Sequence, residues 1–116
     1  MVSKEKIKSI YLIAICGTGM ASLAGLLQKS GYRVTGSDTN IYPPMSTLLK
    51  SSGIDIKPGY QRENISDDID QVIIGNAVSK NNQEVLAVQE KKIPYISFPE
   101  AIKKLQFFTK ITESLS

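Results

Sequence analysis

The chain has 116 residues, of which 41% are apolar and 22% are charged, and its formal net charge is +3. This length fits one domain with a single core, and the composition is that of a soluble globular protein. The single cysteine excludes an internal disulfide, and the absence of histidine removes histidine-based triads and most zinc sites. No apolar run approaches the roughly 20 residues of a membrane span, so we expect a cytoplasmic protein without a membrane partner.

The lysines that give the chain its positive charge are spread along it, with groups at residues 4–8, 91–92 and 103–104. A nucleic-acid interface gathers basic residues on one face, with aromatic residues between them. The sequence has no such grouping. We therefore expect solvated lysines and no nucleic-acid partner.

The first predicted strand covers residues 10–15 and is nearly all apolar, as expected for a strand covered on both faces. A predicted helix follows over residues 20–29, because apolar residues recur there at helical spacing. These are Met20, Leu23, Ala24 and Leu27. Gly31 is suited to end this helix. A second strand over residues 33–37, ending on Asp38, completes the start of a right-handed crossover unit.

Pro44 is predicted to begin a second helix that buries Met45, Leu48 and Leu49. Residues 54–56 form a short strand, placed toward the sheet edge by the proline that follows. Residues 59–70 are polar and indicate a loop with one turn of helix.

Two further strands are predicted over residues 71–76 and 95–97. Between them we expect a helix with a capping box formed by Asn81 and Glu84. Its buried side is predicted to be Val85, Leu86 and Val88. A last helix begins at Pro99 and turns Ala101, Ile102 and Leu105 inward. Residues 109–116 give no firm signal.

Strands that alternate with helices at this spacing predict an α/β fold: a single Rossmann-like domain around a doubly wound, mostly parallel five-stranded sheet. Ligands of such sheets bind beyond the carboxyl ends of the strands, where the strand order reverses. In this chain that edge is built from residues 17–20, 37–40 and 75–78.

A glycine turn over residues 16–19 joins the first strand to the first helix. Backbone N–H groups at the start of a helix lack partners within it, and the helix dipole is positive there, so phosphate binds well. Asp38, about 20 residues further on, stands where a ribose hydroxyl needs an acceptor. Ser22 occupies the place of the third glycine of the usual motif, and Asp38 alone is also compatible with a simple turn carboxylate.

Two other features are open to more than one interpretation. Cys16 lies just before a helix N-terminus, which would make an exposed thiol reactive, but a cysteine after an apolar strand is more often a small buried residue. Asp67, Asp68 and Asp70 are compatible with a metal cluster, but no complementary ligands are identifiable and a solvated loop is favoured. We expect no metal-binding and no catalytic residue in this chain.

Three stretches resemble the N-terminal domain of the Mur ligases of bacterial cell-wall synthesis. They are residues 14–20 (AICGTGM), 36–49 (GSDTNIYPPMSTLL) and 73–77 (IIGNA). The resemblance spans residues 8–105. The second stretch is typical of the branch that recycles wall peptide by joining L-alanyl-γ-D-glutamyl-meso-diaminopimelate to UDP-N-acetylmuramic acid, and the glycine turn is shared with the alanine-adding ligases.

The resemblance implies a UDP-binding domain over residues 1–116, with flanking segments at 1–9 and 109–116. The implied UDP-binding residues are Cys16, Gly17, Thr18, Gly19, Met20, Ser37, Asp38, Thr39, Asn76 and Ala77. The backbone N–H groups of residues 17–20 would face the pyrophosphate, Asp38 with Ser37 would hold the ribose or uracil, and residues 76–77 would complete the wall. Ala14 stands where the family usually has glycine, and its methyl group would tighten the turn.

The family carries out its chemistry with ATP and Mg²⁺ in a central domain that has a P-loop, and a third domain binds the incoming peptide. The sequence has no Gly-Lys-Ser or Gly-Lys-Thr. The resemblance therefore implies that this chain binds UDP-N-acetylmuramic acid, partners the central ligase domain of the same polypeptide, holds no cofactor itself and is inactive alone.

Three functions remain open from the sequence. The first is UDP-sugar binding within an ATP-dependent amide ligase, which adds either the tripeptide or L-alanine. The second is an NAD(P)-binding domain of an oxidoreductase or redox regulator, because strand, glycine turn, helix and acidic residue suit NAD equally well. The third is an interaction module whose glycine turn only packs helix on sheet.

Overall fold

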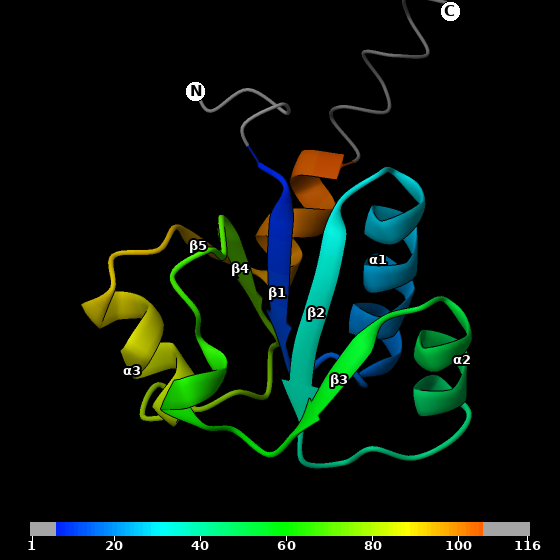
Figure 1. The fold of residues 1–116 in the computed structure, drawn as a ribbon, viewed down its shortest axis with the longest axis horizontal. Coiled ribbons are helices and arrows are strands. Elements are labelled where there is room, and N and C mark those ends of the chain that lie inside the picture. Colours follow the sequence, from blue (N-terminus) through cyan, green and yellow to red (C-terminus); the bar gives the residue numbers. More distant parts are fainter. Residues whose placement is uncertain (1–6, 106–116) are drawn as a thin grey trace, which may run out of the picture.

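The computed structural model describes residues 7–105 of the chain, which form a parallel sheet with helices on both faces (Figure 1). The strands are β1 (Ser9–Ile13), β2 (Arg33–Asp38), β3 (Asp55–Pro58), β4 (Gln71–Ile74) and β5 (Tyr95–Ser97). The helices are α1 (Thr18–Lys29), α2 (Met45–Ser51) and α3 (Gln83–Glu90), with a 3₁₀ turn, η2 (Arg62–Asn64). Residues 98–105 are helical as well. The predicted tail, residues 109–116, lies outside the described residues.

The strands are ordered β3-β2-β1-β4-β5, and every neighbouring pair is parallel. This confirms the predicted Rossmann-like α/β fold with a five-stranded sheet, and it confirms β3 as an edge strand. The chain builds outward from β1 to one edge and then crosses back to build the other. The reversal point therefore lies between β1 and β4, where ligands bind in this fold class.

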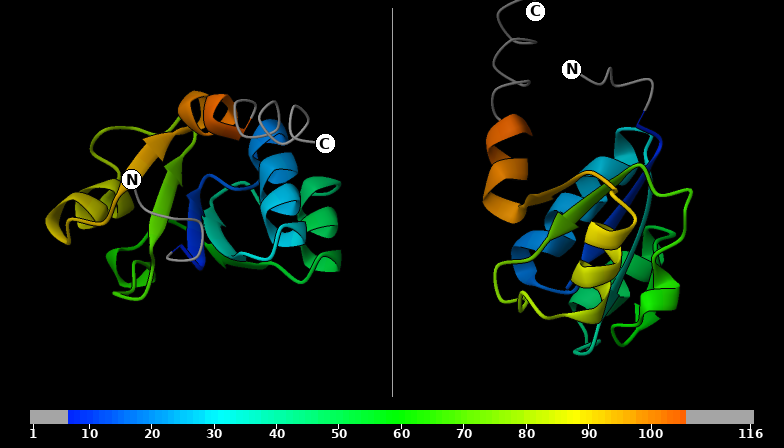
Figure 2. Two further views of the ribbon diagram at one scale, coloured as in Figure 1. Left: turned by 90° about the horizontal axis from the view of Figure 1, so that it is seen from above. Right: turned by 90° about the vertical axis from the view of Figure 1, so that its left-hand side faces the viewer.

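The residues of β1 alternate between two cores, one on each face of the sheet. Ile10 and Leu12 pack with α1, α2 and the helix at residues 98–105, whereas Tyr11 and Ile13 pack with α3. Figure 2 shows these two groups of helices on opposite sides of the sheet. All five residues of β1 are buried, which explains why every residue after Ser9 in this strand is apolar.

Several predicted details differ from the structure. Leu48 is 49% exposed and Leu86 is 41% exposed, although both were predicted to point inward. The N-cap of α3 is Asn82 and not Asn81, and its side-chain oxygen accepts from the backbone N–H of Glu84 at 2.8 Å. A shift of one residue turns a helix face by about 100°, so Ala87 takes the inward place expected for Leu86.

The strand and helix boundaries at the glycine turn also differ from the prediction. β1 ends at Ile13, and α1 begins at Thr18, two residues earlier than predicted. No helix among the described residues is long and apolar enough to cross a membrane.

The acidic loop, Asp67, Asp68 and Asp70, has structural partners. Asp70 accepts the backbone N–H groups of Lys8 and Ser9 at 2.9 Å, which holds the start of β1, and Asp68 pairs with Arg33 at 3.1 Å. Within residues 7–105 no group of acidic, cysteine or histidine side chains is arranged to hold a metal ion.

A fully buried carboxylate, Glu84 of α3, joins α3 to the sheet. It accepts hydrogen bonds from the hydroxyl groups of Tyr11 at 3.0 Å and Ser37 at 2.5 Å, from Asn64 Nδ2 at 2.8 Å and from the backbone N–H of Gln61 at 3.0 Å. Burial raises the pKa of Tyr11 well above its usual range, so its hydroxyl stays a donor. Four donors thus compensate for the burial of one charge.

We predict that Glu84→Ala lowers the free energy of unfolding by about 3 kcal/mol, because it leaves several buried donors without an acceptor. Glu90→Ala on the same helix is the control: Glu90 is exposed and pairs with Arg62 on the surface, so the loss of stability should be much smaller than for Glu84→Ala. Urea unfolding measures both. Equal losses would contradict the role assigned to Glu84.

Candidate functional site

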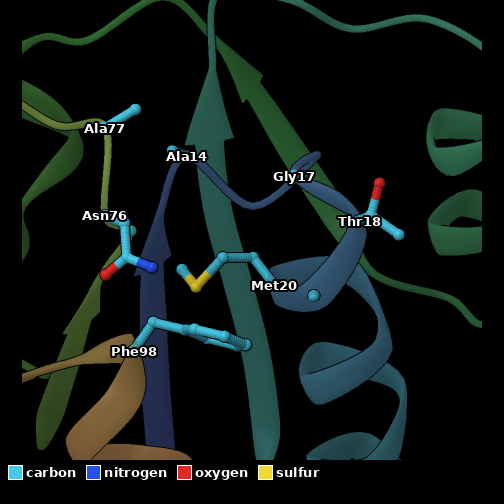
Figure 3. A pocket seen from close by; sticks show the side chains of 9 residues that line it. Ala14, Gly17, Thr18, Met20, Asn76, Ala77 and Phe98 are labelled. Carbon is cyan, nitrogen blue, oxygen red and sulfur yellow. The ribbon is translucent and has the colours of Figure 1, made fainter.

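An open pocket of ≈ 240 Å³ lies at the reversal point, between the carboxyl ends of β1 and β4. It is lined by Ala14, Gly17, Thr18, Gly19, Met20, Gly75, Asn76, Ala77 and Phe98. Figure 3 shows the side chains of Met20, Asn76 and Phe98 pointing toward one another from three different elements. The turn after β1, the start of α1, the turn after β4 and the residue after β5 thus meet at one place.

The turn after β1 is held by the end of β2. The backbone N–H groups of Ala14 and Ile15 donate to the carbonyl oxygen of Ser37 at 2.9 and 3.0 Å. The N–H of Cys16 donates to Asp38 Oδ2 at 3.0 Å. Three consecutive N–H groups of the turn therefore bond to two consecutive residues of β2.

Ala14 has a φ of +72°, in the left-handed region that favours glycine. A residue with a side chain is strained there by about 1 kcal/mol. The turn also packs closely against the end of β4, because a Cβ added to Gly75 would lie 3.2 Å from the Ala14 methyl group. The turn is thus tight, and Gly75 leaves room for the extra methyl.

The start of α1 offers backbone N–H groups to the pocket. The first bond along the helix runs from the N–H of Ala21 to the carbonyl oxygen of Gly17 at 2.7 Å, so the N–H groups of residues 18–20 precede the helical ladder. No side chain among the described residues caps this end, and no acidic residue lies in the first turn. The helix dipole adds positive potential here. This arrangement suits a phosphate.

Phe98 is a pocket residue that the sequence reasoning missed. A Cβ added to Gly19 would lie only 2.6 Å from Phe98 Cζ, so the ring covers the face of α1 that Gly19 leaves open. Phe98 comes directly after β5, at the same sheet edge as the other strand ends. Because parallel strands end at the same edge of a sheet, the position of Phe98 directly after a predicted strand could have identified it as a pocket residue.

The predicted site residues fall into two groups. Gly17, Thr18, Gly19, Met20, Asn76 and Ala77 line the pocket, whereas Cys16, Ser37, Asp38 and Thr39 do not. The side chain of Ser37 is buried and donates to Glu84, on the α3 face of the sheet. Asp38 is 5% exposed, and its second oxygen accepts the N–H of Asn40 at 2.9 Å. Thr39 is exposed.

Cys16 is partly buried, and burial together with the neighbouring Asp38 carboxylate raises the pKa of its thiol, against an opposing effect of Lys50. A raised pKa means less thiolate at neutral pH and slower nucleophilic reaction. The structure favours the interpretation of Cys16 as a packing residue.

We predict that Gly19→Ala destabilises the fold by about 1 kcal/mol, because the new methyl group forces the Phe98 ring to move. Gly25→Ala in the same helix is the control, since nothing lies within 4 Å of a Cβ added there. It should stabilise by about 0.5 to 1 kcal/mol, the usual gain of alanine over glycine in a helix. Thermal unfolding of both variants measures the change in stability. A change of the same sign in both variants would contradict the prediction.

We also predict that iodoacetamide alkylates Cys16 of the folded chain more slowly than it alkylates glutathione at pH 8, because the raised pKa leaves less thiolate. In urea the difference should disappear. Mass spectrometry over time gives both rates. Alkylation faster than that of glutathione would show an activated thiol instead.

Residues 9–107 match the sequence profile of the Mur ligase family, described as its catalytic domain. The chain is 50% identical over 91 residues to the UDP-N-acetylmuramate--L-alanyl-gamma-D-glutamyl-meso-2,6-diaminoheptandioate ligase of Escherichia coli K12, which covers 78% of this chain and 20% of that protein. It is 42% identical over 109 residues to the UDP-N-acetylmuramate--L-alanine ligase of Lactobacillus acidophilus. That match covers 92% of this chain and 25% of that protein. The chain thus spans about a fifth to a quarter of these curated relatives.

Solved structures with the same fold agree. The murein peptide ligase of Psychrobacter arcticus superposes with a TM-score of 0.79 at 38% identity, over 84% of this chain and 20% of that one. The UDP-N-acetylmuramate:L-alanyl-gamma-D-glutamyl-meso-diaminopimelate ligase from Neisseria meningitides superposes with a TM-score of 0.78 at 35% identity. The match covers 84% of this chain and 31% of that one. With a family profile that covers most of its length and the same fold as solved ligases at 35% and 38% identity, this chain belongs to the Mur ligase family.

Proposed function

We propose that this chain binds the UDP part of UDP-N-acetylmuramic acid, as the N-terminal domain of an ATP-dependent amide ligase of peptidoglycan recycling. The observation that carries the proposal is the uncapped start of α1 in the wall of the pocket at the β1–β4 reversal point. The names of both kinds of curated relative begin with UDP-N-acetylmuramate, which supports this substrate.

In this proposal the diphosphate faces the backbone N–H groups of residues 18–20. Asn76, exposed at the opposite wall, supplies a side-chain amide, and Ala77 stands beside it. Met20 and Phe98 form an apolar floor that excludes water and so strengthens the hydrogen bonds above it. The nucleoside extends toward the end of β2, where Thr39 is exposed.

The tripeptide L-alanyl-γ-D-glutamyl-meso-diaminopimelate is our proposed second substrate of the full-length enzyme. The chain is 50% and 45% identical to two ligases named for that peptide, against 42% for an L-alanine ligase. L-Alanine is the alternative. ATP and Mg²⁺ belong to a central domain of the same polypeptide in this proposal, and the 116-residue chain alone binds without catalysing.

Calorimetry on the chain with UDP-N-acetylmuramic acid, UDP, NAD and NADP tests the proposal. We expect both uridine nucleotides to bind and the two dinucleotides not to bind. NAD binding without UDP binding would indicate the oxidoreductase class. If none of the four compounds bound, an interaction module would be favoured.

Asn76→Ala should weaken UDP binding about tenfold, the effect of one lost hydrogen bond to a charged group. Asn81→Ala is the matched control, because Asn81 is also exposed but does not line the pocket. Equal affinities for the two variants would remove Asn76 from the site.

A further inference from the structure

Asp38 is the residue at which the two halves of the proposed site meet. One carboxylate oxygen accepts the N–H of Cys16 in the turn before α1, and the other accepts the N–H of Asn40 in the loop after β2. Both bonds are close to 3 Å, and the residue is 5% exposed. Its side chain does not line the pocket.

We infer that Asp38 is a positioning residue that acts on the ligand through the glycine turn and does not contact the nucleoside. This inference rests on the proposed function. It differs from the expectation for an acidic residue at the end of the second strand, which is a direct hydrogen bond to ribose.

The turn needs external bonds to keep its shape. Ala14 holds the left-handed conformation against strain, so the turn would relax if nothing fixed the residues that follow. Ser37 holds the N–H groups of Ala14 and Ile15 through its carbonyl oxygen, and Asp38 holds the next one. The bond to Asp38 involves a charged acceptor and is therefore the strongest type in this set.

Cys16 lies two residues before Thr18, the first residue of α1. Fixing Cys16 therefore fixes the direction in which the free N–H groups of residues 18–20 point. Donors that are already oriented bind an anion without a further ordering cost. Breaking the bond should weaken the binding of any diphosphate, with or without a nucleoside.

Charge supports the same assignment. An exposed carboxylate beside a diphosphate would repel it. Asp38 is buried, and both of its oxygens already face N–H donors, which turns its charge toward the protein backbone. Ser37, the preceding residue, is anchored from the other face of the sheet by Glu84. The end of β2 is thus fixed from both sides.

The test compares UDP with inorganic pyrophosphate, which has the charge of the diphosphate and no nucleoside. Calorimetry gives both affinities for the unmodified chain, Asp38→Ala and Asp38→Asn. Amide hydrogen exchange at Cys16, followed by NMR without ligand, reports the turn directly. Asp55→Ala, an exposed carboxylate on the edge strand, is the charge-matched control, and Val88→Ala in the α3 core is a control for lost stability.

We expect Asp38→Ala to weaken UDP and pyrophosphate by the same factor, about tenfold or more, and to speed exchange at Cys16 by a similar factor. Asp38→Asn keeps one acceptor oxygen, so its affinities and its Cys16 exchange rate should lie between those of the unmodified chain and those of Asp38→Ala. This variant provides the test if Asp38→Ala does not fold. The two controls should leave both affinities and the Cys16 exchange rate unchanged.

Weaker UDP binding with unchanged pyrophosphate binding would overturn the inference, because Asp38 would then contact the nucleoside. Unchanged exchange at Cys16 would overturn it as well. If the unmodified chain bound pyrophosphate but not UDP, the proposed function would fail. Weaker pyrophosphate binding and faster Cys16 exchange in Asp38→Ala would then still support the action of Asp38 on the turn, and no change in either would overturn it. Binding of neither would overturn both.

Discussion

The hydrogen bonds between the end of β2 and the turn after β1 are the constraint on which the site depends. A parallel pair aligns Ile13 with Ser37, so β2 ends beside the point at which β1 turns away. The carbonyl oxygen of Ser37 and the carboxylate of Asp38 then take the N–H groups of residues 14–16. The N–H of Gly17 donates to the carbonyl oxygen of Ala14, and the N–H groups of residues 18–20 then begin α1 in the wall of the pocket.

The opposite face of the sheet supports this arrangement. Glu84 lies fully buried between α3 and the strands and accepts from Ser37 and Tyr11, on β2 and β1. The residue that holds the turn through its backbone is thus itself held through its side chain. The buried carboxylate network on one face of the sheet and the pocket at its edge are thus connected through two neighbouring strands, β1 and β2.

Sequence patterns predicted the local and repetitive parts of this structure. The apolar run of β1, the spacing in α1 and the alternation of strands with helices were sufficient for the parallel sheet and for the edge at which its strands end. The strand order, which places the reversal point between β1 and β4, came only from the structure. Gly17 marked the turn, whereas Gly19 lies in the first turn of α1. The predicted features depend on neighbours in the chain, so periodicity and turn chemistry report them.

The parts that sequence did not predict depend on contacts between distant residues. Glu84 was expected to cap a helix, yet it meets Tyr11, 73 residues away. Phe98 fills the space beside Gly19 only because β5 ends next to α1. In the short helices α2 and α3, one or two turns do not define a face well, and Leu48 and Leu86 turned out to be exposed.

The most direct measurement of the central claim is an NMR titration of the ¹⁵N-labelled chain with UDP, read at the backbone amides. The account predicts that the amides of Thr18, Gly19 and Met20 shift most, while the amide of Cys16, already bonded to Asp38, stays protected from exchange throughout. Saturating UDP that leaves these three amides unmoved, with its largest shifts elsewhere, would contradict it.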